Sequence, residues 1–327
     1  MKLAELATPA LAVDRELLDT NLRTMSAALP GARLRPHVKA HKCTALARRQ
    51  AALGHEAFTC ATIREMEGLA AAGLGTDLLL ANEVADARRL GALDARVTVC
   101  VDSEATIAAA ARGGVREVLV DVNVGLPRCG CAPGEAGRIA EAARKNGLEV
   151  RGVMGYEGHA VGQADPVKRA DLTAKAMELL ERAHRDVGGD VVSAGGTCTY
   201  ALNTVATEIQ AGSYALMDQS FTYEDIPFRP AFWVESTVIS VSSGYVVADC
   251  GLKALGMDHG NPSIDGAKVW FCSDEHVTFA PASPLRVGDR VRIWPAHVDP
   301  TVAYHERLHL VYGEDVVDVW DVDLRGW

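Results

Sequence analysis

Short β-rich runs alternate with longer helical stretches through the first two thirds of this chain of 327 residues. We expect strands at residues 34–38, 57–61, 77–81, 97–101, 118–124, 149–154, 191–194 and 209–216. Stretches rich in Ala, Leu, Glu and Arg lie between them, at residues 44–53, 64–72, 83–93, 104–111, 135–145 and 166–187, with a weaker one around residue 201. This alternation predicts a parallel sheet, because parallel neighbours are joined by helical crossovers.

Eight strand–helix units over about two hundred residues predict that the sheet closes into a (β/α)8 barrel. An open doubly wound sheet is the alternative, and a Gly-x-Gly-x-x-Gly turn after the first strand would favour it. The sequence has no such turn there. One further helix precedes the first strand. Asp14 is its expected N-cap, and its apolar side chains follow helical spacing at Leu17, Leu18, Leu22 and Met25.

The sequence changes character after a boundary near residues 227–230. Val234–Val241 alternates with a period of two, and turns such as Ser243-Gly244 separate further β-rich runs at 245–249, 269–271, 290–293 and 316–319. We therefore expect an α/β protein with a barrel at residues 9–228 and an all-β domain at residues 229–327. Residues 1–8 are expected to join the all-β domain, because they precede the first barrel helix.

Composition excludes several classes of protein. The formal net charge of −10, without a stripe of clustered Lys and Arg, argues against a nucleic-acid-binding surface. The N-terminus lacks the pattern of a signal peptide, and no run approaches the roughly 18 apolar residues of a membrane helix. The eight cysteines show no zinc-like spacing, and Cys129 and Cys131 form the one close pair. We expect a cytoplasmic protein with buried thiols, no nucleic-acid partner and no membrane partner.

Lys39 lies near the C-terminal end of the first expected strand, within the segment RPHVKAHK at residues 35–42. In a barrel, that end of the strands carries the active site. Partial burial and neighbouring cations lower the pKa of an amine, which makes it a nucleophile toward aldehydes. The available cations are Arg35, Lys42 and, when protonated, His37 and His41. A solvated or anion-binding face is the alternative interpretation of this cluster.

Other polar residues follow later strands at the same end of the expected barrel. Arg128 follows the fifth strand, and Tyr156 and His159 follow the sixth. Barrels often hold phosphate groups on the turns after their last two strands, where glycine lets backbone N–H groups approach the anion. The turns at these places are Gly195-Gly196-Thr197 and Gly212-Ser213-Tyr214. Either turn alone would be an ordinary connection, but the two turns and the lysine together favour a phosphorylated aldehyde cofactor.

A candidate metal pair lies in the expected β domain, in the run Trp294–Thr301. We expect this run to be extended, so that His297 and Asp299, two residues apart, point to the same side. One imidazole and one carboxylate suit a divalent ion that keeps several waters, such as Mn²⁺ or Mg²⁺. The alternative is that the pair is only hydrogen-bonded surface structure.

Eight short motifs can be placed along these elements: TPALAVD, RPHVKAHK, DVNVGLPRCG, GYEGH, SAGGT, GSY, SDEH and PAHVDPTV. Together they resemble the D-threonine aldolase and D-serine dehydratase group, pyridoxal-phosphate enzymes of the alanine racemase fold type. RPHVKAHK and PAHVDPT are the specific motifs, and the glycine turns support them. The resemblance covers nearly the whole chain and implies an N-terminal barrel with a C-terminal β domain.

The resemblance also implies a role for each site residue. Lys39, rather than Lys42, would form the Schiff base with pyridoxal 5'-phosphate. Arg128 would contact the phenolate oxygen of the cofactor, and Tyr156 would lie beside its pyridine nitrogen. The phosphate would be held by Gly195, Gly196, Thr197, Gly212, Ser213 and Tyr214, and the metal by His297 and Asp299. Dehydratases of this group resemble one another in carrying His-x-Cys at the metal pair, so Asp299 favours the aldolase.

The activity implied is cleavage of D-threonine and related D-β-hydroxy-α-amino acids to glycine and an aldehyde, and the resemblance also implies a homodimer. His159 or a metal-bound water would remove the hydroxyl proton. The main alternative is a metal-assisted dehydratase of the D-serine or D-3-hydroxyaspartate type, in which Lys39 takes the α-proton and the products are a 2-oxo acid and ammonia. A racemase and a non-catalytic carrier of the cofactor are further alternatives, and neither gives the metal pair a task.

Overall fold

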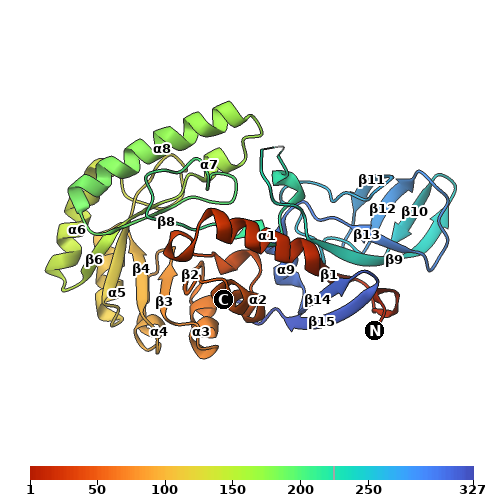
Figure 1. Cartoon of the computed structure of the whole chain (residues 1–327), viewed down its shortest axis with the longest axis horizontal. Coiled ribbons are helices and arrows are strands. Elements are labelled where there is room, and N and C mark those ends of the chain that lie inside the picture. Colours follow the sequence, from red (N-terminus) through yellow and green to blue (C-terminus); the bar gives the residue numbers. More distant parts are fainter. Residues whose placement is uncertain (224) are drawn as a thin grey trace. The chain divides into compact units, whose positions relative to one another are not determined.

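In the computed structural model, which describes residues 1–223 and 225–327, the chain forms two compact units. The barrel unit consists of residues 25–39, 46–212 and 324–327, and the β unit of residues 1–24, 40–45 and 213–323. The two units therefore alternate along the sequence more often than a division at 9–228 and 229–327 implies. Figure 1 labels most of the helices and strands of both units.

The barrel unit contains a parallel sheet of seven regular strands in the order β2-β3-β4-β5-β6-β7-β8 (Figure 1). Their bounds are Ala57–Cys60, Asp77–Leu80, Val97–Val101, Glu117–Asp121, Glu149–Gly155, Val191–Ala194 and Glu208–Ile209. The predicted strands are confirmed, but the last one is much shorter than the predicted 209–216. The chain leaves the sheet after Ile209, and residues Ser213–Ala215 form a 3-10 turn.

The predicted first strand is present only as two isolated bridges. Leu34 pairs with Ile209 of β8, and His37 pairs with Thr59 of β2, both in parallel. The backbone N–H of Arg35 donates to the Ile209 carbonyl at 2.9 Å, and the Thr59 N–H donates to the Pro36 carbonyl at 2.9 Å. Because Pro36 has no N–H, a regular ladder cannot form through it. The segment nevertheless joins β8 to β2 and closes the sheet, so the barrel prediction is confirmed.

Helices follow most of the strands, as the alternation predicted. They are α2 (Thr44–Ala52), α3 (Ile63–Ala71), α4 (Arg88–Gly91), α5 (Glu104–Arg112), α6 (Ala136–Lys145), α7 (Gly158–Val161) and α8 (Pro166–Val187). The sequence explains where α8 begins. The Asp165 carboxylate accepts hydrogen bonds from the backbone N–H groups of Val167 and Lys168, and Pro166 occupies the first helical position.

One predicted helix is shorter than expected, and another is replaced by turns. Only Arg88–Gly91 is helical within the predicted 83–93, because the side chains of Asn82 and Asp86 accept hydrogen bonds from the backbone N–H groups of Glu83 and Arg88. Residues near 201 form turns instead of a helix. In both places short polar side chains compete with helical hydrogen bonding.

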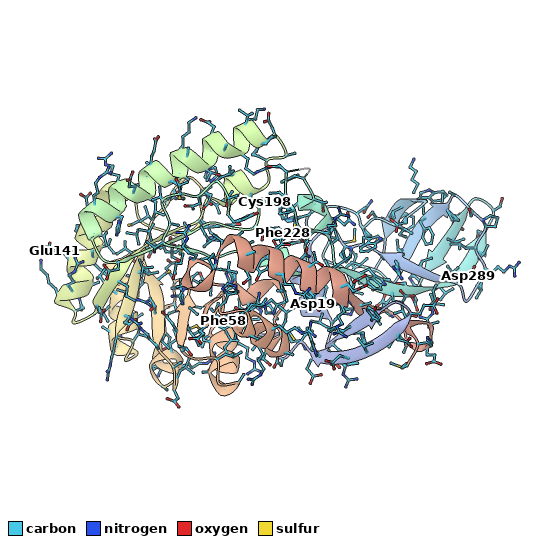
Figure 2. All side chains as sticks on the ribbon, in the orientation of Figure 1. Asp19, Phe58, Glu141, Cys198, Phe228 and Asp289 are labelled. Atoms are coloured by element: carbon cyan, nitrogen blue, oxygen red, sulfur yellow. The ribbon has the colours of Figure 1, made fainter. Side chains whose placement is uncertain are left out.

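Apolar side chains fill the interior of the barrel. Leu79, Cys100, Leu119 and Met154, from four neighbouring strands, form one buried cluster. Phe58 on β2, labelled in Figure 2, is fully buried. The strand positions that alternate toward the interior are thus occupied by side chains, as expected of a closed barrel without a pore.

The β unit contains a sheet in the order β11-β12-β10-β9-β1-β14-β15, with β13 paired to β9. The bounds are Ala10–Asp14 for β1, Phe232–Ser242 for β9, Tyr245–Ala248 for β10, Ala267–Cys272 for β11, Val277–Pro281 for β12, Arg290–Ile293 for β13, Arg307–Tyr312 for β14 and Asp315–Asp321 for β15. Strand β1 runs antiparallel to β9 and parallel to β14. The expected all-β domain and its pairing with the N-terminal segment are therefore confirmed.

Helix α1 (Arg15–Ala28) follows β1, with the Asp14 carboxylate accepting hydrogen bonds from the N–H groups of Glu16 and Leu17. In the part of the chain that the structure describes, no helix is long and apolar enough to cross a membrane. All eight cysteines are free thiols, and six of them are buried.

Candidate active site

Lys39 lies in a short 3-10 turn, Val38–Ala40, directly after the segment that joins β8 to β2. Its two neighbours in the chain are buried, whereas Lys39 itself is partly exposed. Its backbone N–H donates to Nδ1 of His37 at 3.4 Å. The lysine therefore follows the C-terminal end of the irregular first strand, as the sequence predicted.

Arg35 does not belong to the mouth of the barrel, contrary to the sequence interpretation. Its buried guanidinium donates to Glu208 at 2.8 Å and to Asp77 at 3.1 Å, and Arg151 donates to Asp77 at 2.9 Å. Asp77 and Glu208 are the first residues of β3 and β8, so this network lies at the N-terminal ends of the strands. Its carboxylates pair with Arg35, which therefore does not belong to the cationic cluster expected around Lys39.

The pKa of Asp77 reflects this network. Burial acts to raise it, but hydrogen bonds from Arg151 and Arg35 and their positive charges lower the pKa from 3.8 to about 2. Asp77 is thus held as a carboxylate between two guanidinium groups. The network closes the end of the barrel opposite to Lys39 and contributes to stability rather than to chemistry.

Arg128, Tyr156 and His159 come together at the C-terminal ends of β5 and β6. The guanidinium carbon of Arg128 lies 5.3 Å from the centre of the Tyr156 ring. His159, in α7, covers Gly125 of the loop after β5, because a Cβ on Gly125 would lie only 2.7 Å from Cε1 of the imidazole. Gly125 also has φ +129°, so the close approach and the backbone conformation both require glycine.

The loop after β7 is attached to the loop after β6 by Glu157. This buried carboxylate accepts hydrogen bonds from the Thr199 hydroxyl at 2.7 Å and from the Gly195 N–H at 3.3 Å. Burial raises its pKa, against those two hydrogen bonds. The Gly196 N–H donates to the Thr199 hydroxyl at 3.0 Å. A Cβ on Gly196 would lie 3.5 Å from the Tyr156 ring, so the predicted phosphate turn lies beside the tyrosine.

The second predicted phosphate turn is divided between the two units. Gly212 belongs to the barrel unit, where a Cβ would lie 2.5 Å from the carbonyl oxygen of His37. Glycine is therefore required for the turn to approach the segment that carries the lysine. Ser213 and Tyr214 belong to the β unit, where the buried Tyr214 ring lies 5.7 Å from that of Phe228.

A carboxyl pair that the sequence analysis missed also lies at the C-terminal ends of the strands. Burial, followed by the negative charge of Glu83, raises the pKa of Asp121, the last residue of β5, whereas Arg128 acts in the opposite direction. No spacing along the sequence links the two residues, because Asp121 ends β5 and Glu83 follows β3.

The predicted metal pair has a different backbone from the one expected. His297 is the N-cap of a helix that was not predicted, α9 (Val298–Tyr304), and Asp299 lies in its first turn. The two residues therefore do not share one side of an extended run, and the geometric argument for the pair is wrong. The Asp218 carboxylate accepts a hydrogen bond from the Val298 N–H and so supports this helix start.

Two other residues with ligand-type atoms lie beside His297. Asp258, His259 and His297 each offer one such atom, and these atoms lie within 4.8 Å of one another. Nδ1 of His297 lies 2.7 Å from a carboxylate oxygen of Asp258, and the two imidazole rings stack at 3.9 Å with 11° between their planes. Burial and then His297 lower the pKa of His259, whereas Asp258 and Asp299 act to raise it. Asp299 thus lies near enough to this cluster to act on it electrostatically.

A model of the family described as "Alanine racemase, N-terminal domain" matches residues 13–219, more than half of the chain. The chain belongs to the alanine racemase family. The match confirms the resemblance seen in the sequence, and it covers the barrel residues Lys39, Arg128, Tyr156 and His159. A second model, for a serine dehydratase domain, matches residues 231–311, which contain His297 and Asp299.

Relatives of this member of the alanine racemase family match nearly its whole length. D-threonine aldolase from Arthrobacter sp is 32% identical, over 99% of this chain and 94% of its own length. The 3-hydroxy-D-aspartate aldolase of Paracoccus denitrificans is 31% identical, over 99% and 93%. The crystal structure of D-threonine aldolase from Filomicrobium marinum has a TM-score of 0.94 and 35% identity, covering 100% of this chain and 98% of that one.

A dehydratase with the same fold is also similar. The structure of D-threo-3-hydroxyaspartate dehydratase from Delftia sp. HT23 has a TM-score of 0.89 and 25% identity, and each chain covers 100% of the other. Solved variants of that enzyme replace a histidine and a cysteine two positions apart, and the cysteine variant is described as metal-free.

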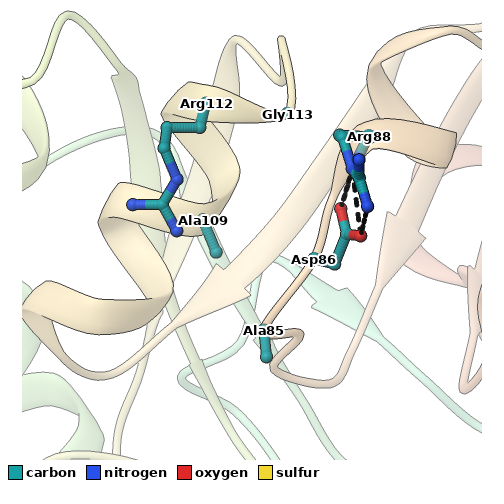
Figure 3. A pocket seen from close by; sticks show the side chains of 6 residues that line it. All are labelled: Ala85, Asp86, Arg88, Ala109, Arg112 and Gly113. Atoms are coloured by element: carbon teal, nitrogen blue, oxygen red, sulfur yellow. Dashed lines mark hydrogen bonds and ion pairs between the residues drawn. The ribbon is translucent and has the colours of Figure 1, made fainter.

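None of these residues lines a hollow found on the barrel unit. It has a volume of about 570 Å³ and is lined by Ala85, Asp86, Arg88, Ala109, Arg112 and Gly113. Figure 3 shows the Asp86–Arg88 ion pair at its edge, with the helix that carries Ala109 and Arg112 opposite. Both members of that pair are exposed, so the hollow has no buried group that could carry chemistry.

Proposed function

We propose that this protein is an aldehyde-lyase that cleaves D-threonine or a related D-β-hydroxy-α-amino acid to glycine and an aldehyde. Two aldolases of such substrates match 99% of the chain at 32% and 31% identity, which supports this reaction over the racemase and carrier alternatives. The substrate is a small amino acid in each case. A dehydratase is the second candidate, because the structure of one also covers the whole chain.

The barrel residues fit pyridoxal phosphate. Lys39 would hold it through Nζ, with Arg128 and Tyr156 beside its ring. Nδ1 of His159 is buried and has no hydrogen-bond partner among the residues that the structure describes. An unpartnered buried imidazole nitrogen is costly unless a bound molecule meets it. Gly195, Gly196 and Thr197 would hold the phosphate, together with the turn at residues 212–214.

Different residues of the chain would then have different roles in the cleavage. When bound, pyridoxal phosphate supplies an electron sink for the pair left at Cα when the Cα–Cβ bond breaks. His159 is the proposed base that takes the proton of the β-hydroxyl group, at Nδ1. Glu157 would keep the loops on either side of that histidine in place, since it holds Gly195 and Thr199 by hydrogen bonds.

The identity of the metal ligands distinguishes the aldolase from the dehydratase proposal. We propose that His297 and Asp299 bind a divalent cation, Mn²⁺ or Mg²⁺, whose Lewis acidity lowers the pKa of the substrate hydroxyl. In the similar dehydratase, the residue two positions after the histidine is a cysteine, and a variant at that cysteine is described in its metal-free form. In this chain that position holds Asp299. A carboxylate is a harder ligand than a thiolate and suits Mn²⁺ or Mg²⁺.

Two further proposals accompany this function. Free thiols at all eight cysteines suit a reducing compartment, so we propose a cytoplasmic location. We also propose a homodimer, by analogy with barrels of this group that are joined to β domains.

Product analysis tests the reaction. The purified protein, with pyridoxal phosphate and Mn²⁺, is incubated separately with D-threonine, 3-hydroxy-D-aspartate, D-serine and L-threonine. We expect glycine with acetaldehyde from D-threonine or glycine with glyoxylate from 3-hydroxy-D-aspartate, and nothing from L-threonine. Formation of 2-oxobutanoate and ammonia from D-threonine, without acetaldehyde, would show a dehydratase instead.

A further inference from the structure

We propose that Asp258 and His259 are positioning residues of the metal centre, which fix the imidazole of His297 so that Nε2 is the atom offered to the cation. The inference rests on the proposed function, because it takes His297 as a metal ligand. Neither Asp258 nor His259 belongs to the predicted metal pair. The backbone, the edge and the face of the His297 ring are each held by different contacts.

The backbone of His297 is fixed by its neighbour in the β unit. His297 forms an antiparallel bridge with Gly256. The buried Thr301 hydroxyl donates to the His297 carbonyl at 2.6 Å and accepts from the Gly256 N–H at 2.8 Å. A Cβ on Gly256 would lie 2.3 Å from the Pro300 ring, so glycine permits this close approach.

The turn that carries Asp258 and His259 is held on both sides of the two residues. The Gly256 bridge precedes them, and the bridge between Ser263 and Trp294 follows them, with two hydrogen bonds of 2.9 Å. Within the turn, the Gly260 N–H donates to the Met257 carbonyl at 3.2 Å, and Gly260 has φ +113°, a conformation that favours glycine. Both side chains are thus presented to His297 from a defined backbone.

Asp258 determines which imidazole nitrogen is available. Its carboxylate lies 2.7 Å from Nδ1 of His297, and because a carboxylate accepts hydrogen bonds, we assign the proton to Nδ1, which donates the hydrogen bond. Nε2 then keeps its lone pair, and it has no hydrogen-bond partner among residues 1–223 and 225–327. A carboxylate behind a metal-binding histidine fixes the tautomer and raises the basicity of the ligand nitrogen.

His259 holds the face of the ring rather than the cation. The two imidazole planes differ by only 11° and their centres are 3.9 Å apart, so their in-plane lone pairs are nearly parallel and cannot both point at one ion. The Phe221 ring contacts His259 edge-on, at 5.3 Å and 73°. His259 is therefore part of a stack that restrains rotation of His297, and its nitrogen atoms are not needed for that role.

Titration with Mn²⁺ tests both residues without any assay of activity. The holoenzyme is stripped of metal with a chelator, and free Mn²⁺ is followed by its electron paramagnetic resonance signal. Asp258→Ala should raise the dissociation constant about 10–100-fold, the usual cost of losing such a partner. Asp258→Asn should stay within about threefold of wild type, because the amide oxygen can still accept from Nδ1. His259→Ala should bind several-fold more weakly, and His259→Phe, which keeps the stack, should be close to wild type.

Controls separate this inference from the metal assignment itself. Asp321→Ala removes the same charge from an exposed position of the same unit, where it pairs with Arg307 at 3.7 Å, and should bind like wild type. Unchanged visible absorbance of the cofactor shows that each variant is folded.

Wild-type affinity in Asp258→Ala, or equal losses in Asp258→Asn and Asp258→Ala, would overturn the role of Asp258. Equal losses in His259→Phe and His259→Ala would make His259 a ligand. If His297→Ala binds like wild type, the metal assignment fails with it.

Discussion

At the residue scale, the structure separates the two lysines of RPHVKAHK. Lys39 lies in the 3-10 turn that directly follows the closing segment of the barrel. Lys42 comes after that turn and adopts φ 47°, an unusual value for a residue other than glycine. The backbone thus gives the two side chains different starting points, although they are only three residues apart.

Replacement of Lys39 should therefore remove the cofactor linkage, whereas replacement of Lys42 should not. Lys39→Ala is expected to lose the visible absorbance of the bound cofactor, because its Nζ is the proposed attachment atom. Lys42→Ala provides the matched control, since it removes the same charge and keeps Lys39. An absorption spectrum of each purified variant decides the point. Loss of the band in Lys42→Ala, with retention in Lys39→Ala, would contradict the assignment.

Most of the barrel site residues could be predicted from the sequence, because the C-terminal ends of parallel barrel strands meet at one end of the barrel. Residues that follow those strands are therefore close together in space. Arg128, Tyr156 and Gly196 were found in this way. The contribution of Asp258 and His259 was not predictable by this logic, because 39 and 38 residues separate them from His297 and only two bridges bring them together. The helix at Asp299 had a signal that was overlooked: an acidic residue followed by Pro300 is typical of a first helical turn.

At the element scale, strand positions were predicted better than strand regularity. The closing segment contains Pro36, which removes one donor, and β8 contains only two residues before the chain turns away. Hydrophobic pattern alone does not show that the first strand is irregular. The ion-pair network at the N-terminal ends of the strands was also missed, because its four members, Arg35, Asp77, Arg151 and Glu208, come from four different segments of the chain.

The network makes a prediction about acid stability. The folded pKa of Asp77, about 2, lies below its ordinary value of 3.8. The stabilisation is therefore complete above about pH 4 and is lost as the pH falls toward 2. A shift of this size corresponds to about 2 kcal/mol of unfolding free energy.

Asp77→Asn should destabilise the protein at pH 7 by about 2 kcal/mol, because it removes the carboxylate that Arg35 and Arg151 share and leaves them Glu208 and Glu117 as charged partners. Denaturant unfolding at pH 7, 4 and 3 measures the difference in unfolding free energy between the variant and wild type. We expect that difference to be equal at pH 7 and 4 and to narrow at pH 3. A difference that is constant down to pH 3 would show that Asp77 is not held as a low-pKa carboxylate.

At the scale of the whole molecule, the proposed homodimer has a direct test. Light scattering coupled to size-exclusion chromatography should give a mass near twice the 34.8 kDa of the chain. Activity should fall on dilution into the range where the dimer dissociates, if the two chains complete each other's function. A stable and fully active monomer would contradict the proposal.

Cleavage of D-threonine with and without a divalent cation tests the central claim most directly. The account predicts that a thoroughly chelated sample keeps its cofactor absorbance, loses cleavage by at least about 10²–10³-fold, and recovers when Mn²⁺ is returned. His297→Ala and Asp299→Ala should behave like the chelated enzyme and should not recover. Full release of glycine and acetaldehyde by the metal-free protein would contradict the account.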